Sequence, residues 1–462
     1  MVYYEKYIKR ISMKISQTIT AISTSHGIGG IGIIRISGKD SFMISNKISR
    51  KTCLKNRYAY ISKFYDQKNQ IIDNGILLHF KRPNSYTGED VVEIHCHGNY
   101  ILLEKILKVI CSYGAKIAKP GEFTYRAFIN KKIDLIQAES INNLISAQTM
   151  SAARASQRSL RGDFSNIVND IIDRLIKLRM YVESSIDFTT EDIDFITIKK
   201  TQSILLKIIN QLNKIFEITQ CEERINREIK VVITGKPNVG KSTLLNKLSK
   251  HKVAIVTEYA GTTRDLVKSK ININGVLLEI IDTAGIHKSS NLIENHGIKI
   301  AKKEINKADI IIKIICFDKI SSRDSYYKNI LSSKNKKEII VVNKIDLLKE
   351  KEISYLNSMN KIVLISAEKN LGVMNLLSKI NVLIKKNHSI ENNFLARKRH
   401  LLALKKSLKH LKQSYNITKK NMQLDFLANE LYLSQLSLEE ITGKFTSDDL
   451  LGKIFNEFCI GK

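Results

Sequence analysis

The chain lacks several features that mark common protein classes. Its 462 residues contain no tryptophan, and 45 acidic residues stand against 75 lysines and arginines. No run approaches the ~18 uncharged apolar residues of a membrane-spanning helix, and the most apolar stretch, Ile310–Phe317, is short and contains Lys313. The six cysteines form no C-x-x-C pair. That scatter argues against a disulfide scaffold and favours the reduced thiols of a cytosol.

The excess of positive charge has two interpretations. A formal net charge of +30 suits a polyanionic partner such as nucleic acid or an anionic membrane. Heavy use of Lys, Ile and Asn without Trp is also what a genome rich in A and T would impose. The hydrophobic share of 43% is enough for real cores, which excludes a disordered basic tail protein.

Hydrophobic periodicity divides the chain into four segments. Residues 1–130 mix strand-like runs with one helical stretch, as in an α+β unit. Residues 131–227 and 386–462 are helical, and residues 228–385 alternate strands and helices as in a doubly wound parallel sheet. Each helical segment alone is too thin to bury both faces. We therefore expect a multidomain α+β protein: an N-terminal α+β domain, a bundle built from both helical segments, and an α/β domain inserted between them.

A nucleotide-binding motif opens the α/β segment. The strand-like Ile229–Thr234 precedes Gly235–Ser242, which fits G-x-x-x-x-G-K-S, and a helical stretch, Thr243–Leu248, follows. In this context the loop's backbone N–H groups surround phosphate oxygens, and the helix N-terminus adds its positive end. Lys241 would reach the β- and γ-phosphates, and the Ser242 hydroxyl would bind Mg²⁺.

Three further motifs follow in order, each after a strand-like run. Asp282-Thr283-Ala284-Gly285 offers a carboxylate for Mg²⁺ and an N–H for the γ-phosphate. Asn343-Lys344-Ile345-Asp346 carries a carboxylate that would accept both N–H donors of guanine, a pattern that adenine lacks, and Ser366-Ala367 would support the base. Such folds bind ligands at the carboxyl ends of their strands. The four motifs in this order therefore predict a P-loop GTPase.

Hydrolysis needs groups outside these four motifs. Between the first two lies Gly261-Thr262-Thr263-Arg264-Asp265, in which Thr263 is the candidate that completes Mg²⁺ coordination. Small GTPases place a Gln directly after the D-x-x-G glycine to orient water, but here that position is Ile286. Glu294 is the first acid after the motif. It is the candidate for orienting water, and a solvated helix charge is the alternative.

Long stretches of the chain resemble one family of GTPases. They include Gly29–Gly38, Ser85–Gly98, Lys119–Leu135, Asp187–Phe195 and the C-terminal Gly443–Lys462, which ends in Phe-Cys-Ile-Gly-Lys. With the GTPase motifs, they resemble the MnmE/TrmE tRNA modification GTPases from residue 13 onward. The resemblance implies a folate-binding N-terminal domain, a helical domain, and a G domain inserted into the latter. That architecture matches the one that periodicity predicts.

The resemblance also implies a function. Family members form homodimers through their N-terminal domains and work with a flavoprotein of the MnmG/GidA type in a heterotetramer. Together they add an aminomethyl or carboxymethylaminomethyl group to C5 of the wobble uridine of certain tRNAs. A one-carbon unit of 5,10-methylenetetrahydrofolate (or formyl-tetrahydrofolate) supplies the methylene. The expected location is the cytoplasm, and the alternative function is a GTP-switched RNA-binding or ribosome assembly GTPase.

Roles at the nucleotide site follow from the resemblance as well. Asn238 matches the family's K⁺ ligand, and Thr257, Tyr259 and Thr262 fall on the loop that wraps this ion. K⁺ against the phosphates can neutralise developing charge as an arginine finger would. Glu294 matches the glutamate that orients the attacking water. The candidate GTP contacts are Asn238, Val239, Gly240, Lys241, Ser242, Thr243, Thr257, Glu258, Tyr259, Ala260, Gly261, Thr262, Thr263, Asp282, Thr283, Ala284, Gly285, Asn343, Lys344, Asp346, Ser366 and Ala367.

Four residues match the family's folate-binding positions: Arg35, Glu93, Lys132 and Lys462. Arginine and lysine suit a folate's glutamate tail or pterin carbonyl, and Glu93 suits the pterin's paired N–H donors. The resemblance places Cys459 close to the folate as a functional residue. A thiolate there would be a good nucleophile.

Three other patterns have both a structural and a functional interpretation. Gly27–Gly32 fits G-x-G-x-x-G, but the β-branched run after it predicts a glycine turn before a strand rather than a dinucleotide site. His95-Cys96-His97 lacks the further Cys or His that a tetrahedral metal site needs, so we expect a structural or folate-pocket role for this triplet. Arg397–Lys420 carries nine Lys/Arg and no acid. This amphipathic helix indicates either a tRNA phosphate-contact surface or a solvated helix face.

Overall fold

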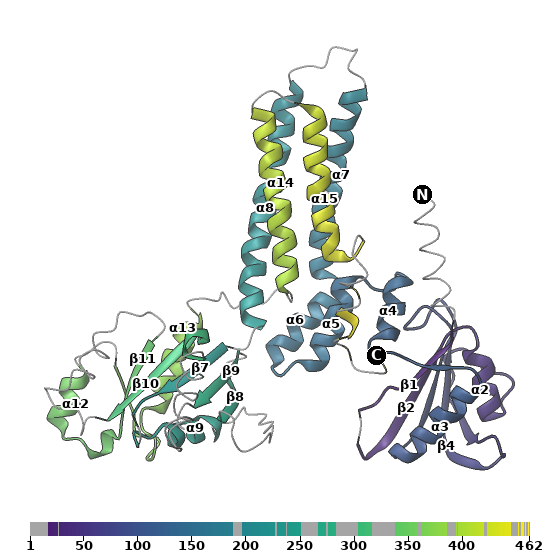
Figure 1. Ribbon diagram of the computed structural model, residues 1–462, viewed down its shortest axis with the longest axis horizontal. Coiled ribbons are helices and arrows are strands. Elements are labelled where there is room, and N and C mark those ends of the chain that lie inside the picture. Colours follow the sequence, from purple (N-terminus) through teal and green to yellow (C-terminus); the bar gives the residue numbers. More distant parts are fainter. Residues whose placement is uncertain are drawn as a thin grey trace, which may run out of the picture. The chain divides into compact units, whose positions relative to one another are not determined.

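The chain folds into two compact units, shown in the ribbon diagram of Figure 1. The first comprises residues 1–142, 159–208 and 406–462, and the second comprises residues 143–158 and 209–405. The computed structural model describes residues 17–25, 27–187, 196–226, 229–236, 238–250, 267–273, 276–282, 304–316, 338–357, 362–385, 394, 396–419, 423–444, 451, 454–456, 458 and 461.

The first unit begins with a six-stranded sheet in the order β3-β4-β5-β2-β1-β6. Neighbouring strands are antiparallel, except that β6 runs parallel to β1. Alternate residues such as Ile34, Ile36 and Ile94 are buried against α2 and α3, so the period of two defines the core face. The bounds are β1 Ile19–Ile22, β2 Gly29–Ser37, α2 Ser41–Ser49, β3 Tyr60–Tyr65, β4 Ile71–Phe80, β5 Val91–Gly98, α3 Tyr100–Ser112 and β6 Lys116–Ile117.

A second, smaller core joins helix α4 (Glu122–Ile129) to the end of the chain. Tyr125 and Phe128 of this helix pack with Phe455 and Phe458, and the rings of Tyr125 and Phe455 meet edge to face at 5.2 Å between centroids. The C-terminal segment is therefore built into the N-terminal region. The domain limits that periodicity predicts stay a prediction.

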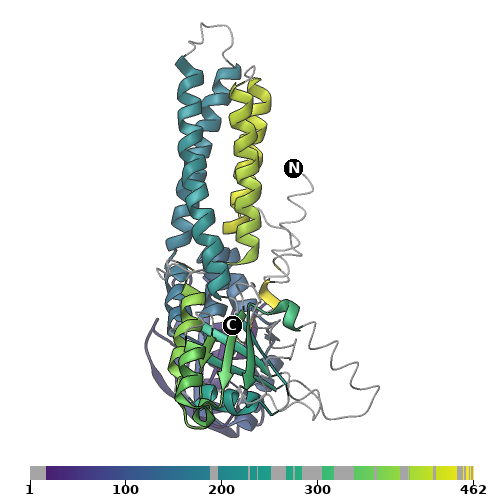
Figure 2. The same ribbon diagram turned by 90° about the vertical axis from the view of Figure 1, so that its left-hand side faces the viewer.

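Helices α7, α8, α14 and α15 lie side by side, as the two views in Figures 1 and 2 show. Arg179 of α7 donates a hydrogen bond to Gln435 of α15 at 2.7 Å, and Gln202 of α8 donates to the Thr418 carbonyl of α14 at 2.9 Å. The bundle therefore draws on both helical segments, as periodicity predicts. In the described part of the chain, no helix is long and apolar enough to cross a lipid bilayer. The bounds are α5 Leu135–Ser146, α6 Met150–Leu160, α7 Asp163–Asp187, α8 Ile196–Asn226, α14 Lys398–Lys419 and α15 Leu424–Thr442.

The second unit contains a six-stranded sheet in the order β12-β11-β10-β7-β9-β8. All neighbours are parallel except the edge pair β8–β9. The strands β8 and β9, which follow β7 in sequence, lie on one side of it in the sheet, and the later strands β10, β11 and β12 lie on the other side. The end of β7 is therefore a topological switch point, where such sheets bind ligands. The bounds are β7 Ile229–Thr234, α9 Lys241–Lys250, β8 Val267–Ile273, β9 Val276–Asp282, β10 Ile310–Cys316, β11 Glu338–Asn343, α12 Glu350–Asn357, β12 Ile362–Leu364 and α13 Val373–Lys385.

Candidate functional site

The loop that follows β7 has the geometry of a phosphate-binding loop. Asn238 and Gly240 have positive φ angles of 62° and 92°, which turn the chain sharply toward α9. A Cβ at Gly235 would lie 2.4 Å from the carbonyl oxygen of Ile314 on the adjacent strand, so glycine lets the loop approach the sheet. The first turn of α9, which contains Ser242, points its N–H groups and positive dipole end at this loop.

Lys241 is held inside the loop. Its side chain is buried, and its Nζ donates hydrogen bonds to the carbonyls of Gly235 at 2.8 Å and Lys236 at 2.9 Å. A buried ammonium group needs such acceptors to offset its lost hydration. The loop therefore presents a fixed positive charge at the place where a bound phosphate would lie.

Asn343 connects the phosphate-binding loop to the loops of two neighbouring strands. Its Nδ2 donates to the Val239 carbonyl at 2.8 Å, and its Oδ1 accepts from the Ala367 backbone N–H at 2.9 Å. A Cβ on Gly240 would lie 2.2 Å from this Nδ2, so the bridge needs glycine at that position. Three of the four predicted GTPase motifs thus meet at the carboxyl edge of the sheet.

Asp346 lies in the same loop cluster as a carboxylate ready to accept hydrogen bonds. A hydrogen bond from Ser366 is the main cause that lowers its pKa below the ordinary value, and the charge of Lys369 adds to this effect. The Lys369 Nζ lies 3.7 Å from Asp346 Oδ2. An ionised carboxylate accepts two parallel N–H donors, which matches the predicted recognition of guanine.

Three other predicted residues of the nucleotide site lie at the ends of strands or in a helix of the same unit. Asp282 is the last residue of β9, and Thr243 lies in α9. Lys344 adopts a left-handed conformation with φ 62°. Thirteen predicted residues lie outside the described part of the chain, and their roles stay predictions: Thr257, Glu258, Tyr259, Ala260, Gly261, Thr262, Thr263, Thr283, Ala284, Gly285, Glu294, Cys459 and Lys462.

Arg35 and Glu93, two predicted folate contacts, face each other across β2 and β5. The Arg35 Nε and Nη2 donate to Glu93 Oε1 at 2.9 and 2.8 Å, and Glu93 Oε2 lies 3.2 Å from His95 Nε2. Burial raises the pKa of Glu93, but the His95 hydrogen bond and the Arg35 charge together outweigh it and lower the pKa. The sheet therefore carries an ionised, half-buried charge pair at the predicted position.

Two aromatic rings flank this charge pair. The Arg35 guanidinium carbon lies 5.3 Å from the ring centroid of Tyr86 and 5.7 Å from that of Phe123. The Tyr86 hydroxyl shares a hydrogen bond of 2.8 Å with Thr124, and burial raises the pKa of Tyr86, so the phenol stays neutral. Donors, an acceptor and ring faces together suit a planar heterocycle. Lys132, the third predicted folate contact, is exposed.

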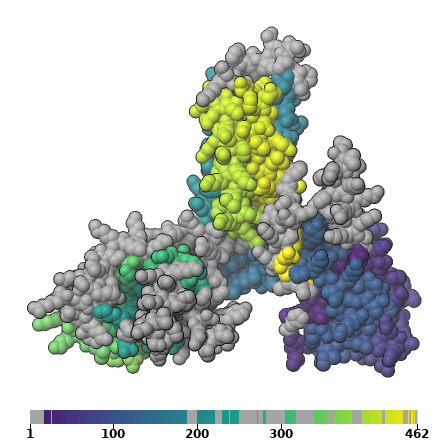
Figure 3. Space-filling view, in the orientation of Figure 1, coloured from purple at the N-terminus to yellow at the C-terminus, as the bar shows by residue number. Residues whose placement is uncertain are grey.

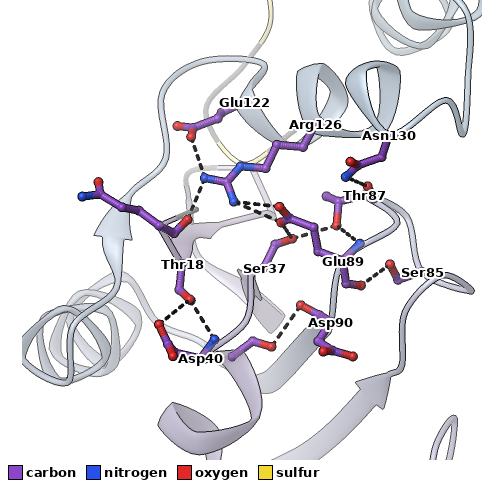
Figure 4. Close-up of polar contacts among 12 residues, drawn as sticks. Thr18, Ser37, Asp40, Ser85, Thr87, Glu89, Asp90, Glu122, Arg126 and Asn130 are labelled. Atoms are coloured by element: carbon purple, nitrogen blue, oxygen red, sulfur yellow. Dashed lines mark hydrogen bonds and ion pairs between the residues drawn. The ribbon is translucent and has the colours of Figure 1, made fainter. Parts of the chain in front are cut away.

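A buried arginine holds the segments that carry these rings, as Figure 4 shows. Arg126 Nη1 donates to both carboxylate oxygens of Glu89, at 3.2 and 3.0 Å. Its Nη2 donates to the Gln17 carbonyl at 2.8 Å and to Glu122 Oε1 at 3.0 Å. Ser37, at the end of β2, donates to Glu89 Oε2 at 2.7 Å. One network therefore fixes β2, α4 and the loop that contains Tyr86.

Neither the two rings nor this network was among the site residues predicted from the sequence. Tyr86 lies in the stretch Ser85–Gly98, and Phe123 and Arg126 lie in Lys119–Leu135, so each falls within a stretch that carries the resemblance. That coincidence was the available signal. What it could not provide was the pairing of residues from separate stretches.

The His-Cys-His triplet on β5 is accounted for by local partners. His95 bonds to Glu93, and His97 Nδ1 lies 2.7 Å from Asp73 Oδ1. Between them Cys96 is buried, and its burial raises the thiol pKa to about 12. Among the described residues no cluster of His, Cys, Asp or Glu could hold a metal ion. Because His95 bonds to Glu93, a predicted folate contact, both the structural and the folate-pocket role stay predictions.

Comparison with known protein families gives two matches that together cover most of the chain. The model described as "GTP-binding protein TrmE N-terminus" matches residues 18–132, and the model of the MnmE helical domain matches residues 135–459. Among solved structures, Era from Aquifex aeolicus is 33% identical over 40% of this chain and 67% of its own, with a TM-score of 0.27. The FeoB G-domain from Methanococcus jannaschii is 24% identical over 34% of this chain and 99% of its own, with a TM-score of 0.26.

Two curated relatives align over nearly the whole chain. The protein of Francisella philomiragia is 43% identical over 470 residues, which cover 97% of this chain and all of the relative. That of Francisella tularensis subsp. holarctica is 44% identical over 468 residues, with the same coverage. Both are named tRNA modification GTPase MnmE. With a helical-domain match over most of its length and relatives of this identity, the chain belongs to the MnmE family.

Proposed function

We propose that the chain is a K⁺-activated GTPase that, with a flavoprotein partner, modifies C5 of the wobble uridine of certain tRNAs. The observation that carries the GTPase part is the joined loop cluster, in which buried Lys241 and ionised Asp346 lie on loops bridged by Asn343. Such a site binds the phosphates at one end and the guanine base at the other. The part in tRNA modification rests on family membership.

Hydrolysis in this proposal depends on two ions and one acid. Ser242 and Thr263 would hold Mg²⁺, while Asn238, Thr257, Tyr259 and Thr262 would hold K⁺. When bound, these ions supply positive charge against the charge that develops on the phosphates. Asn238 fits this role because it is exposed on the phosphate-binding loop, whereas Lys241 of the same loop is bonded to loop carbonyls. Glu294 would orient the attacking water.

The N-terminal site supplies the one-carbon unit in this proposal. Arg35 and Glu93 would bind the head of a tetrahydrofolate near the rings of Tyr86 and Phe123, since these groups offer paired hydrogen bonds and ring faces. Lys132 and Lys462 would bind its acidic tail, and Cys459 would lie nearby as a nucleophile. Homodimerisation and the flavoprotein complex belong to the same proposal.

The K⁺ assignment is tested by measuring GTP hydrolysis in KCl and in NaCl at equal ionic strength. Asn238→Ala should lose K⁺ stimulation while its guanine nucleotide affinity stays largely intact. The matched control is Asn246→Ala, which changes an exposed asparagine on helix α9, after the loop that contains Asn238. This variant should keep the stimulation. Stimulation that survives in Asn238→Ala would remove Asn238 from the ion site.

The folate assignment is tested on the full chain. A fragment that ends near residue 130 would strip Phe455 and Phe458 from α4 and expose its apolar face. Tetrahydrofolate should bind the wild type, and binding should be lost in Glu93→Gln but kept in Glu104→Gln, a more exposed glutamate on α3. If the wild type binds no tetrahydrofolate while its GTP turnover is normal, the GTP-switched RNA-binding alternative becomes the better account.

A further inference from the structure

Charge is segregated among the helices of the bundle. Helix α14 contains six lysines and one arginine but no Asp or Glu. Helix α15, which follows it, contains one Asp and three Glu but no Lys or Arg. On α8 the first acid is Glu217, so its first 21 residues, 196–216, are free of acids. Compositional drift toward lysine would place lysines on α15 as well, so drift alone does not explain this pattern.

Five exposed lysines of the first unit form what we call the lysine face: Lys199 and Lys207 on α8, and Lys409, Lys412 and Lys419 on α14. The hydrogen bond from Gln202 to the Thr418 carbonyl fixes the level at which the two helices meet. Lys199 lies one turn before Gln202, and Lys419 adjoins Thr418. The two helices run antiparallel. Lys207, five residues after Gln202, therefore lies at about the same height along the bundle as Lys412, six residues before Thr418. Figure 3 shows α14 open along the bundle surface.

The lysine face is not used by the contacts that hold the bundle together. Polar side chains of α14 that contact α15 include Lys406, 3.6 Å from Glu440, and His410, 2.8 Å from Glu430. Ser407 also shares a hydrogen bond of 2.7 Å with Ser434. At 100° per residue, Lys412 and Lys419 lie on the opposite flank of α14. Among the residues that the structure describes, none of the five lysines has a carboxylate partner. By contrast, Arg174 and Arg179 of α7 pair with acids of their own helix.

We infer that the lysine face binds the phosphate backbone of the tRNA, an inference that rests on the proposed function. Exposed lysines that have no carboxylate partner among the described residues can release counterions from a polyanion and give affinity without reading sequence. Tyr415, whose ring lies 4.6 Å from the Lys419 Nζ, adds an aromatic surface beside the cations. A bilayer fits less well. Surface-bound helices insert an apolar face, but Leu408 and Leu411, which lie in the part of α14 that carries the lysine face, are buried.

The test measures the affinity of the full chain for an unmodified tRNA transcript across a NaCl series at fixed KCl and Mg²⁺. The variant is Lys207→Gln/Lys412→Gln/Lys419→Gln. Its matched control, Lys63→Gln/Lys68→Gln/Lys177→Gln, removes three exposed lysines outside the face and changes net charge equally. Each lost phosphate contact lowers the salt slope by about 0.7–0.9. The face variant should therefore lose about 2 from the slope and at least about tenfold in affinity near 0.1 M salt, whereas the control should stay near the wild type.

Two outcomes would overturn the inference. One is an equal loss, or no loss, in both triple variants, because net charge rather than this face would then set the affinity. The other is unchanged tRNA binding together with lost binding to vesicles that contain a quarter anionic phospholipid. GTP turnover without tRNA should equal that of the wild type in both variants, which checks their folding. The proposed function is judged by a different measurement, tRNA modification by the wild type. It stands if the wild type modifies tRNA and fails if the wild type does not, whatever the two variants show.

Discussion

Removing the buried charge of Arg126 should loosen the site that contains Arg35 and Glu93. Arg126 is 1% exposed, and its four hydrogen bonds tie Glu89, Glu122 and the Gln17 carbonyl together. In Arg126→Met the side chain keeps its apolar length, but the Glu89 carboxylate loses its cation. Breaking one partner of a buried ion pair costs ~3–5 kcal/mol. Because tenfold corresponds to ~1.4 kcal/mol, opening of this region should become more than ~100-fold more frequent.

Hydrogen exchange of the full chain, read by mass spectrometry, measures this opening locally. Peptides covering β2, β5 and the loop between residues 85 and 90 should exchange faster in Arg126→Met, while β7 and β10 should be unchanged. Lys108→Ala is the control, since its ion pair with Glu104 is 76% exposed at the lysine, and exposed pairs contribute ~0–1 kcal/mol. Equal exchange in the two variants would refute the argument that the Arg126 network supports the site.

Three further changes test the two sites. Gly240→Ala should lower GTP affinity at least about tenfold in a nucleotide titration, because its Cβ would lie 2.2 Å from Asn343 Nδ2 at a φ of +92°; an unchanged affinity would count against the bridge. Asp346→Asn should weaken GTP by about 100-fold and favour xanthosine triphosphate, whose added carbonyl accepts from the new amide; equal losses for both nucleotides would deny base recognition. The Glu93 carboxyl should titrate below its ordinary pKa of 4.5 in carbon-13 NMR, since its folded pKa is lowered. Its stabilising effect is then present above pH ~4.5 and is lost as pH falls through the folded value; titration above 4.5 would show that burial prevails.

The parts of the fold that follow from local patterns could be predicted. The run Ile229–Thr234 forms a strand with these bounds. A short run rich in β-branched residues that is buried on both faces is typical of a strand in a parallel sheet. The glycine-rich Gly27–Gly32 opens no helix, as predicted, but β2 already begins at Gly29, so most of this stretch lies in the strand rather than in a turn before it. By contrast, periodicity did not indicate α2, whose serines and isoleucines are poor helix formers. It forms because Ile44 and Ile48 are buried against the sheet, which is a tertiary effect.

The placement of candidate site residues could be predicted where one motif carries its own chemistry. Lys241 lies in its loop as the spacing requires, and the register pairs Arg35 with Glu93. The rest depends on contacts between distant stretches. A buried arginine such as Arg126 is rare, and only its partners, up to 109 positions away in sequence, explain it. The contact between Phe455 and Tyr125 likewise cannot be predicted from a local sequence pattern.

In the proposed function, the GTP site of this chain drives modification of wobble uridines. This claim is tested most directly by mass analysis of wobble nucleosides in tRNA from cells that lack the chain. We predict that the C5-modified uridine disappears, that wild-type chain restores it, and that Lys241→Ala, expressed at the same level, does not. Unchanged nucleosides in cells without the chain, or full restoration by Lys241→Ala, would contradict the account.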